Sequence, residues 1–198
     1  MVIKMQIRLW LPAAFVRFGI SLLLLYRRLR YGYPFRRIKL SRGLFAKVDP
    51  DDFDRLSVYK WSATGSNGCT VYAVRTVWRN GRRCSIPMHR VILNAPKNMQ
   101  VDHINRDGLD NRKVNLRLVT PQQNTWNRKR SDPGRSQYKG VSWSKRNSKW
   151  QVHIQINGKQ KYLGYFDNEI SAACAYDKAA FRHRGQYAYL NFPPSNRD

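Results

Sequence analysis

Polar side chains between residues 99 and 127 have the types and spacing that hydrolysis of a phosphodiester requires. Asp102 and His103 are adjacent, Asn115 follows the histidine by twelve residues, and Asn124 follows it by twenty-one. A neutral histidine can take a proton from attacking water near pH 7. An asparagine such as Asn115 can accept a ring N–H through its amide oxygen and so fix the tautomer of His103.

Hydrolysis also requires a hard cation that neutralises the phosphate and the leaving oxygen. Carboxylate and amide oxygens suit magnesium, so Asp102 and Asn124 are the predicted ligands of one divalent ion, Mg²⁺ or Mn²⁺. Because the protein supplies only these two ligands, coordination positions remain open for phosphate and water. The sequence therefore predicts a single-metal centre in which His103 is the general base.

Local patterns place these residues on a strand, a loop, a second strand and a helix. Residues 100–104 form a short predicted strand, 105–113 a polar loop, and 115–119 alternate between polar and apolar as a half-buried strand does. The polar loop residues are interpreted as turn formers. These are Asn105, Asp107, Asp110 and Asn111.

The predicted helix begins at a strong start signal. Thr120 is the expected cap, Pro121 the first helical residue, and Gln123 completes a capping box. Asn124 then falls in the first turn, and residues three and four positions later share its face. Those residues, Asn127 and Arg128, are candidates for contacting nucleic acid.

The segment before this block predicts short mixed elements. A hairpin is expected over 38–48, a helix over 51–59, and two strands over 72–78 and 82–86 around the Asn80-Gly81 turn. Another short helix is expected over 88–93. It carries His89 and Arg90, and His89 either contacts phosphate or only packs at the edge of the core.

Residues 131–137 form the expected linker, and the segment after it predicts an independent module. Strands are expected over 138–143, 150–156 and 160–166, followed by a helix that Asp167 or Asn168 caps and that runs to about Arg184. Alanines let this helix lie close to the apolar sheet face. The expected fillers of that contact are Ile170, Cys174 and Phe181.

Charge and composition limit the partners. Lys and Arg number 37 against 12 acidic residues, a net charge of +25, which favours a polyanion. Nucleic acid is preferred over an anionic membrane because basic residues alternate with aromatic ones in segments that predict folded structure. The cysteines, Cys69, Cys84 and Cys174, include no CxxC pair, so they are interpreted as small buried residues in a reducing cytoplasm.

Residues 1–36 are basic and partly apolar, and they allow three interpretations. The segment 9–26 is minimal in length for a membrane span and contains Arg17 and Pro12. It also fits an interfacial or packed helix, or a poorly ordered extension before the domain. The extension is preferred, and membrane contact is not expected.

The Asp102-His103 pair, the spacing to Asn115 and Asn124, and the upstream His89-Arg90 resemble the His-Asn-His (HNH) homing endonucleases of phages and mobile introns. The resemblance covers about 40–128. It implies a ββα-metal fold, His103 as base, Asn115 as its orienting partner, and Asp102 with Asn124 as metal ligands.

A second resemblance covers nearly all of 138–193. Tyr138-Lys-Gly-Val, Tyr162-Leu-Gly-Tyr-Phe and Leu190-Asn-Phe-Pro are similar to the APETALA/ethylene-response-factor DNA-binding domain. The predicted sheet has a polar face away from the helix, and a face of this kind fits the DNA major groove. The resemblance puts these residues in DNA-facing places: Lys139, Ser142, Ser144, Lys149, His153, Gln155, Lys161 and Tyr162.

The expected fold is therefore α+β, a nuclease domain over 37–130 followed by a small three-stranded antiparallel sheet packed on one helix over 138–193. The expected function is a sequence-selective, metal-dependent DNA endonuclease acting on double-stranded DNA in the cytoplasm of a bacterial or phage-infected cell. No small-molecule substrate is expected, and a monomer is favoured. The alternative is a DNA-binding regulator whose nuclease domain is vestigial.

Overall fold

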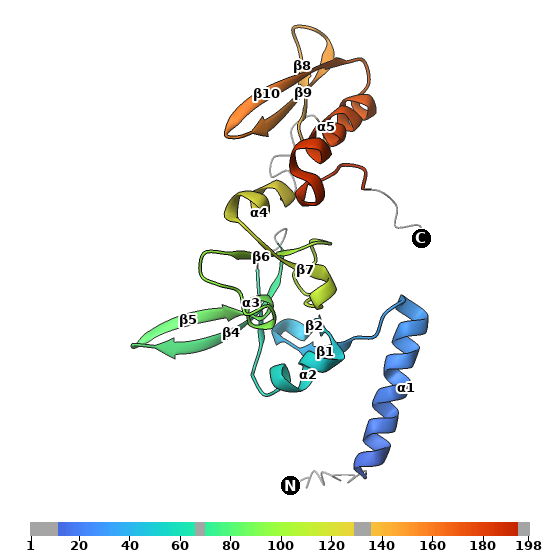
Figure 1. Ribbon diagram of the computed structural model, residues 1–198, viewed down its shortest axis with the longest axis vertical. Coiled ribbons are helices and arrows are strands. Elements are labelled where there is room, and N and C mark those ends of the chain that lie inside the picture. Colours follow the sequence, from blue (N-terminus) through green and yellow to red (C-terminus); the bar gives the residue numbers. More distant parts are fainter. Residues whose placement is uncertain (1–11, 66–69, 129–135, 194–198) are drawn as a thin grey trace, which may run out of the picture. The chain divides into compact units, whose positions relative to one another are not determined.

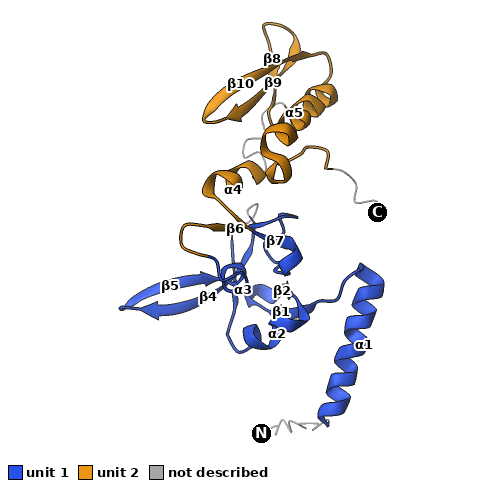
Figure 2. Cartoon of the chain, in the orientation of Figure 1, with its two compact units in different colours: residues 1–95, 101–117 blue, residues 96–100, 118–198 orange. Residues whose placement is uncertain are grey.

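A computed structural model describes residues 12–65, 70–128 and 136–193 as helices and antiparallel sheets (Figure 1). The predicted α+β class is confirmed. The chain divides into two compact units, residues 1–95 with 101–117 and residues 96–100 with 118–198 (Figure 2). The predicted linker over 131–137 lies mostly outside the described residues.

The first unit contains the predicted hairpin, short helices and longer hairpin in the predicted order. Its apolar core is formed by residues such as Ile38, Val48, Leu56 and Trp61. Its elements are α1 (Ala13–Tyr31), β1 (Arg36–Lys39), η1 (Ser41–Gly43), β2 (Phe45–Val48), α2 (Pro50–Ser57), β3 (Ser62–Thr64), β4 (Tyr72–Arg79), β5 (Arg82–Pro87), α3 (Met88–Ile92) and η2 (Lys113–Asn115).

Two further strands and a helix surround the residues predicted to carry the chemistry. β6 (Gln100–His103) and β7 (Leu116–Val119) form a two-stranded sheet. α4 (Pro121–Asn127) follows with the predicted capping box, in which the Thr120 hydroxyl accepts from the Gln123 backbone N–H and the Gln123 side chain accepts from that of Thr120. The order strand, strand, helix is as predicted, and the ββα-metal arrangement in space stays a prediction.

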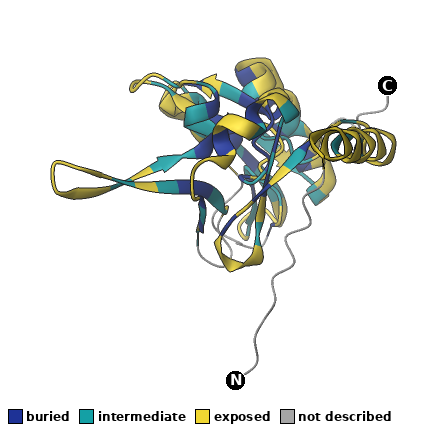
Figure 3. Cartoon of the chain, turned by 90° about the horizontal axis from the view of Figure 1, so that it is seen from below, coloured by how far each residue is buried: buried dark blue, intermediate teal, exposed yellow. Residues whose placement is uncertain are grey.

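The leader was expected to be a poorly ordered extension, with a helix as one alternative, and over Ala13–Tyr31 the helix is what the structure shows. These residues form α1, in which no side chain is buried (Figure 3). Alanine, leucine and arginine favour helix, which accounts for the local structure without a packed face. Among the described helices, none has both the length and the apolarity to cross a membrane.

The second unit contains the predicted three-stranded sheet and helix. The strands β8 (Val141–Ser144), β9 (Lys149–Ile156) and β10 (Lys159–Phe166) pair in the order β10-β9-β8, and α5 (Glu169–Arg184) is capped by Asn168 and followed by η3 (Gly185–Tyr187). The core joins Val152 and Ile154 of β9 to Ala172, Ala173 and Tyr176 of α5.

The predicted fillers of the helix–sheet contact are wrong. Ile170 and Phe181 are 60% and 63% exposed, and Cys174 is exposed as well. Tyr176, which is 2% exposed, takes the contact instead, because it shares a face with the small alanines at 172, 173 and 180. The expectation of buried cysteines likewise fails at Cys174, while Cys69 lies outside the described residues.

Gly140 must be glycine for two reasons. Its φ is +79°, and a Cβ there would lie 2.0 Å from the Tyr176 ring. Gly158 has nearly the same φ, +78°, but has nothing within 4 Å of its Cβ position. The two positions therefore separate backbone strain from steric exclusion.

We expect Gly140→Ala to destabilise the second unit much more than Gly158→Ala does. The left-handed backbone costs both variants about 1 kcal/mol, and only Gly140→Ala must also displace a buried ring. Chemical denaturation of both variants measures the difference. Equal losses of unfolding free energy would show that the ring moves without cost.

Candidate active site

His103 ends β6 in a buried cluster of rings. The residue is 4% exposed, and its ring centroid lies 5.1 Å from that of His89 and 5.7 Å from that of Tyr72. Tyr72 begins β4 and His89 lies in α3, so three separate elements enclose the imidazole. Burial lowers the pKa of His103, and the hydrogen bond that its ring donates to Asn111 and the charge of Asp102 oppose that shift. The ring is therefore neutral near pH 7, as a general base must be.

The loop after His103 is tied to β2 by backbone hydrogen bonds. The Lys47 N–H donates to the Leu109 carbonyl and the Asn111 N–H donates to the Lys47 carbonyl, both at 2.8 Å. The Asp49 carboxylate then accepts from the Lys113 N–H at 2.7 Å. A segment predicted as a polar loop is thus fixed to the core of the first unit.

Asp110 and Arg112 form a buried ion pair inside this loop. Asp110 is 1% exposed, and both its oxygens accept from the Arg112 guanidinium, at 2.6 and 2.7 Å. Burial alone would raise the pKa of Asp110, but the hydrogen bonds and charge of Arg112 outweigh it and hold that pKa below its ordinary value. Removing one partner of such a pair leaves an uncompensated buried charge and costs about 3–5 kcal/mol.

Asn115 does not have the role predicted for it. Its amide oxygen accepts from the Asn105 backbone N–H at 2.9 Å, and its amide N–H donates to the Asp110 carbonyl at 2.8 Å. Both groups therefore close the loop rather than orient the His103 ring. The correction has a simple cause, because Asn115 lies in η2 at the base of the loop, before β7 begins.

Asn111 is the asparagine beside the histidine ring. Its residue exposure is 0%, and its amide oxygen lies 3.4 Å from His103 Nε2. An amide oxygen only accepts, so this contact assigns the ring proton to Nε2 and the lone pair to Nδ1. Asn111 was interpreted as a turn former. An asparagine in a polar loop predicts a turn whether its amide is exposed or buried. The role of Asn111 was missed for this reason.

Gly108 permits the loop to approach the start of β4. A Cβ at this position would lie 2.4 Å from the Val71 carbonyl oxygen and 2.7 Å from the Tyr72 ring. The Gly108 carbonyl also accepts from the Asn111 amide at 3.4 Å. The close approach therefore sets the orientation of the amide that faces His103.

The two predicted metal ligands lie in different units. In the first unit Asp102 is 7% exposed, and its Oδ2 accepts from Arg117 at 2.7 and 2.9 Å. In the second unit the Asn124 amide donates to the Gln100 side chain at 2.7 Å, which leaves the amide oxygen as an acceptor. A buried carboxylate and an amide oxygen fit a hard divalent ion. That Asp102 and Asn124 bind the same ion stays a prediction.

Comparison with known proteins bears on this arrangement. Residues 94–125 match the model of a family described as HNH endonuclease, a stretch that includes Asp102, His103, Asn111, Asn115 and Asn124. An uncharacterized HNH endonuclease of Acanthamoeba polyphaga mimivirus is 30% identical over 157 residues, which cover 76% of each chain. The chain belongs to the HNH endonuclease family.

Other relatives match shorter parts of this HNH protein. APETALA2-like protein 2 of Oryza sativa subsp. indica is 51% identical over 57 residues, which are 29% of this chain and 13% of that protein. Protein 3.8 of Escherichia phage T7 is 40% identical over 65 residues, 33% of this chain and 54% of the phage protein. The HNH protein thus spans only a small part of its plant relatives.

His89 lies beside the HNH histidine, and its environment is apolar. Its Nδ1 is buried and has no hydrogen-bond partner among the described residues, and the ring packs edge-on against Tyr72 and His103. Burial, and then the neighbouring His103 and Arg90, lower the pKa of His89 from 6.5 to about 3. Of the two interpretations left open, packing at the edge of the core is therefore the one that these contacts support.

Of three other residues predicted to bind DNA, Arg90 and Asn127 are engaged or buried within the protein, and Arg128 is exposed. Arg90 donates to the Ala95 carbonyl at 3.1 Å, and Asn127 is 7% exposed. Arg128 follows the end of α4 in an extended conformation, so it does not share a helical face with Asn124. The helix is shorter than the sequence predicted, and this removes the expected alignment.

In the second unit, strand register decides which predicted residues lie on the sheet face opposite α5. Residues paired in antiparallel strands share a face. Ser142 pairs with Gln151, Ser144 with Lys149, and His153 with Tyr162, and none of these belongs to the core. Gln155, paired with Gln160, continues the row. Ser142, Ser144, Lys149, His153, Gln155 and Tyr162 therefore lie on the predicted face, where Tyr165 packs against Tyr162 and was not predicted.

Two predicted residues do not lie on that face. Lys161 pairs with Ile154, which is in the core, so its side chain lies on the side that α5 covers. The Lys139 ammonium donates to the Trp126 and Arg128 carbonyls at 2.9 and 2.5 Å. Lys139 therefore neutralises the carboxyl end of α4. Both positions are corrections to the sequence prediction.

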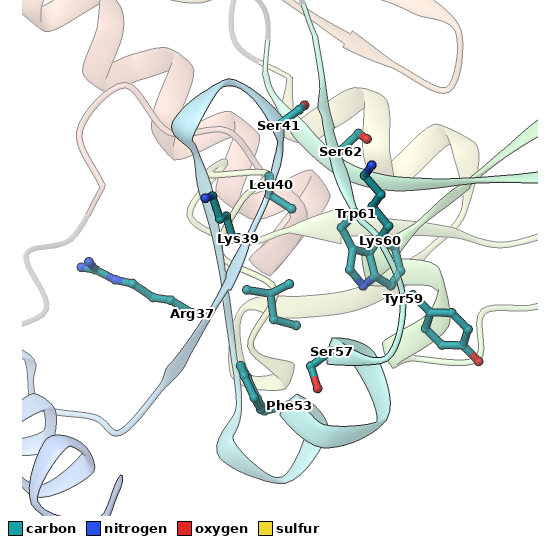
Figure 4. A pocket seen from close by; sticks show the side chains of 11 residues that line it. Arg37, Lys39, Leu40, Ser41, Phe53, Ser57, Tyr59, Lys60, Trp61 and Ser62 are labelled. Atoms are coloured by element: carbon teal, nitrogen blue, oxygen red, sulfur yellow. The ribbon is translucent and has the colours of Figure 1, made fainter. Parts of the chain in front are cut away.

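The first unit also has an open pocket of about 410 Å³ between β1, α2 and β3 (Figure 4). Basic side chains at Arg37, Lys39 and Lys60 line it together with Phe53 and Tyr59. It contains none of the residues predicted to carry the chemistry. Pocket size therefore does not identify the candidate site in this protein.

We expect Asn111→Ala to lower the turnover number for DNA cleavage by roughly 10- to 100-fold while DNA affinity stays the same, because only the orientation of His103 is lost. Asn111→Asp keeps an acceptor oxygen and should retain more activity. Single-turnover cleavage, with circular dichroism as a check of folding, measures this. A folded Asn111→Ala protein with wild-type turnover would contradict the role.

Protonation of His89 should destabilise the first unit in acid. Its pKa is about 3 when folded against an ordinary 6.5, so the unfolded chain binds the proton more readily. The unfolding free energy is therefore highest above pH 6.5 and falls as pH decreases from 6.5 towards 3. His89→Gln should flatten this dependence in melting curves from pH 4 to 8. Identical slopes for both proteins would refute it.

Proposed function

We propose that this HNH protein is a metal-dependent endonuclease that hydrolyses phosphodiester bonds in double-stranded DNA. The observation that carries the proposal is the buried His103, neutral and held at Nε2 by Asn111, directly after the Asp102 carboxylate. A positioned neutral imidazole of this kind activates water for attack on phosphorus.

In this proposal each group of the chain has one task. His103 accepts the proton of the attacking water at Nδ1 and holds it as the imidazolium, which the carboxylates of Asp102 and Asp110 stabilise by charge. Asn111 prevents the ring from rotating. Asp102 and Asn124 would hold a divalent ion, which when bound supplies positive charge to the phosphate and the leaving oxygen. Magnesium is the ion that this donor set favours.

The second unit would supply the sequence selectivity. Its exposed sheet face presents hydroxyl, amide, imidazole and phenol groups, from Ser142 to Tyr162, that can donate to or accept from base edges and phosphates. The plant relatives of this segment are APETALA2-like proteins, which supports a role in DNA contact. We propose that this face positions the duplex and that the first unit cleaves it.

One contact favours a second candidate function, DNA binding without cleavage. Arg117 occupies Oδ2 of Asp102 with two hydrogen bonds, and a carboxylate so neutralised attracts a divalent ion less strongly. If Arg117 stays in place on DNA, the HNH centre is vestigial. If it turns towards the phosphate, Asp102 becomes available.

A plasmid assay separates the two functions. We expect the protein to nick or linearise supercoiled DNA with Mg²⁺ or Mn²⁺ and not with chelator, and His103→Ala to lose about 10²–10⁴-fold in rate. The matched control is His183→Ala, since His183 is an exposed histidine of α5. Gel-shift affinity should be unchanged in both variants.

Cleavage by His103→Ala at the wild-type rate would refute the assignment of the base. Binding without cleavage by the wild-type protein, in either metal, would establish the second candidate.

A further inference from the structure

The hairpin of β4 and β5 extends well beyond the sheet to which it belongs. β3 pairs only with Tyr72, Ala73 and Val74, so the remainder of β4 pairs with β5 alone as a two-stranded ribbon. Asn80 and Gly81 close it with φ values of 49° and 71°, as a tight hairpin turn requires. The ribbon projects from the first unit, and its end is exposed (Figures 1 and 3).

The tip of this ribbon concentrates positive charge at a cost to folding. Arg79 lies directly opposite Arg82, and like charges in such a pair are destabilising. Arg83 follows on the other face, opposite Trp78. Within the described part of the chain, none of the three arginines forms an ion pair. Nothing in the fold uses this charge, so an anionic partner is its most direct explanation.

Trp78 makes the tip more than a basic patch. Its side chain is 72% exposed, which is unusual for the largest apolar residue. It gains contact area only against another molecule. A flat aromatic ring opposite one arginine, with two more arginines on the other face of the tip, matches a nucleic acid, in which sugars and bases lie between rows of phosphates.

The base of the ribbon is fixed to the candidate active site. Tyr72, the first residue of β4, packs against both His89 and His103. β5 ends at Pro87, and His89 follows in α3. Six residues lead from Tyr72 to Trp78, which at roughly 3.3 Å each is about 20 Å. This length corresponds to about six base pairs of duplex.

We propose that the β4–β5 hairpin is a DNA-contacting finger, which enters a groove of the substrate about six base pairs from the bond that His103 attacks. Arg79, Arg82 and Arg83 contact phosphates there, and Trp78 lies against sugar or base. The major groove is wide enough for a two-stranded ribbon. This inference rests on the proposed function, because it takes the substrate to be duplex DNA.

The test compares two triple variants in the His103→Ala background, where DNA stays intact. The finger variant is Arg79→Gln, Arg82→Gln and Arg83→Gln. The control is Arg37→Gln, Lys39→Gln and Lys60→Gln, which removes the same charge from exposed side chains around the separate pocket (Figure 4). Affinity for duplex DNA is measured against salt concentration.

Each lost phosphate contact reduces the magnitude of the slope of log affinity against log salt concentration by about 0.9. We therefore expect this slope to fall by about 2 to 3 in the finger variant and to change little in the control. Hydroxyl-radical footprints should lose protection about six base pairs from the cleaved bond in the finger variant alone. Trp78→Ala should weaken binding at high salt, and Trp78→Phe should restore part of it.

Equal changes of the salt slope in the two triple variants would show diffuse electrostatic attraction and would overturn the proposal that the hairpin contacts DNA. So would an unchanged footprint. If instead the proposed function is wrong, the His103→Ala protein with an intact hairpin binds no duplex at all. That result can be told apart from the two above. Binding of the His103→Ala protein to anionic vesicles through this hairpin, but not to DNA, would also overturn the inference.

Discussion

The buried ion pair between Asp110 and Arg112 is the interaction on which the candidate site depends. It lies within a loop whose other polar groups are also satisfied internally, by Asn105, Asn115 and the backbone of Lys47. A loop with so many buried polar groups is stable only when every one has a partner. The result is a rigid frame that presents the Asn111 amide to His103, and the chemistry proposed for that histidine needs such a frame.

Electrostatics in the first unit divide into a neutral centre and a basic exterior. His103 is buried and His89 half-buried, and both stay uncharged, since burial lowers the pKa of both rings. Carboxylates near them are paired with arginines, Asp102 with Arg117 and Asp110 with Arg112. The net charge of +25 is therefore expressed mostly at the exposed surface. That distribution draws a polyanion to the protein while keeping a base unprotonated inside it.

The second unit solves a different problem, which is to expose one face of a small sheet without losing its core. Alanines at 172, 173 and 180 bring α5 close to the sheet, and Tyr176 fills the space beside Gly140. The helix–sheet core needs no side chain from the opposite face. The serines, glutamines, histidine and tyrosines of that face consequently take no part in the core, so they can vary without unfolding the unit.

The sequence by itself determined the local elements and the candidate residues for the proposed chemistry. Alternation of polar and apolar residues predicted the strands, Asn80-Gly81 predicted the tight turn between β4 and β5, and the Thr120 capping box predicted the start of α4, because each of these signals acts over a few neighbouring residues. The Asp102-His103 pair was found by residue type and spacing. Only the tertiary structure decided that Asn111 rather than Asn115 faces the ring, since that depends on contacts of the loop with β2 and Tyr72. It also decided that Lys161 lies on the face covered by α5 and that Lys139 caps α4, because strand register and contacts between distant segments leave no mark in the local sequence.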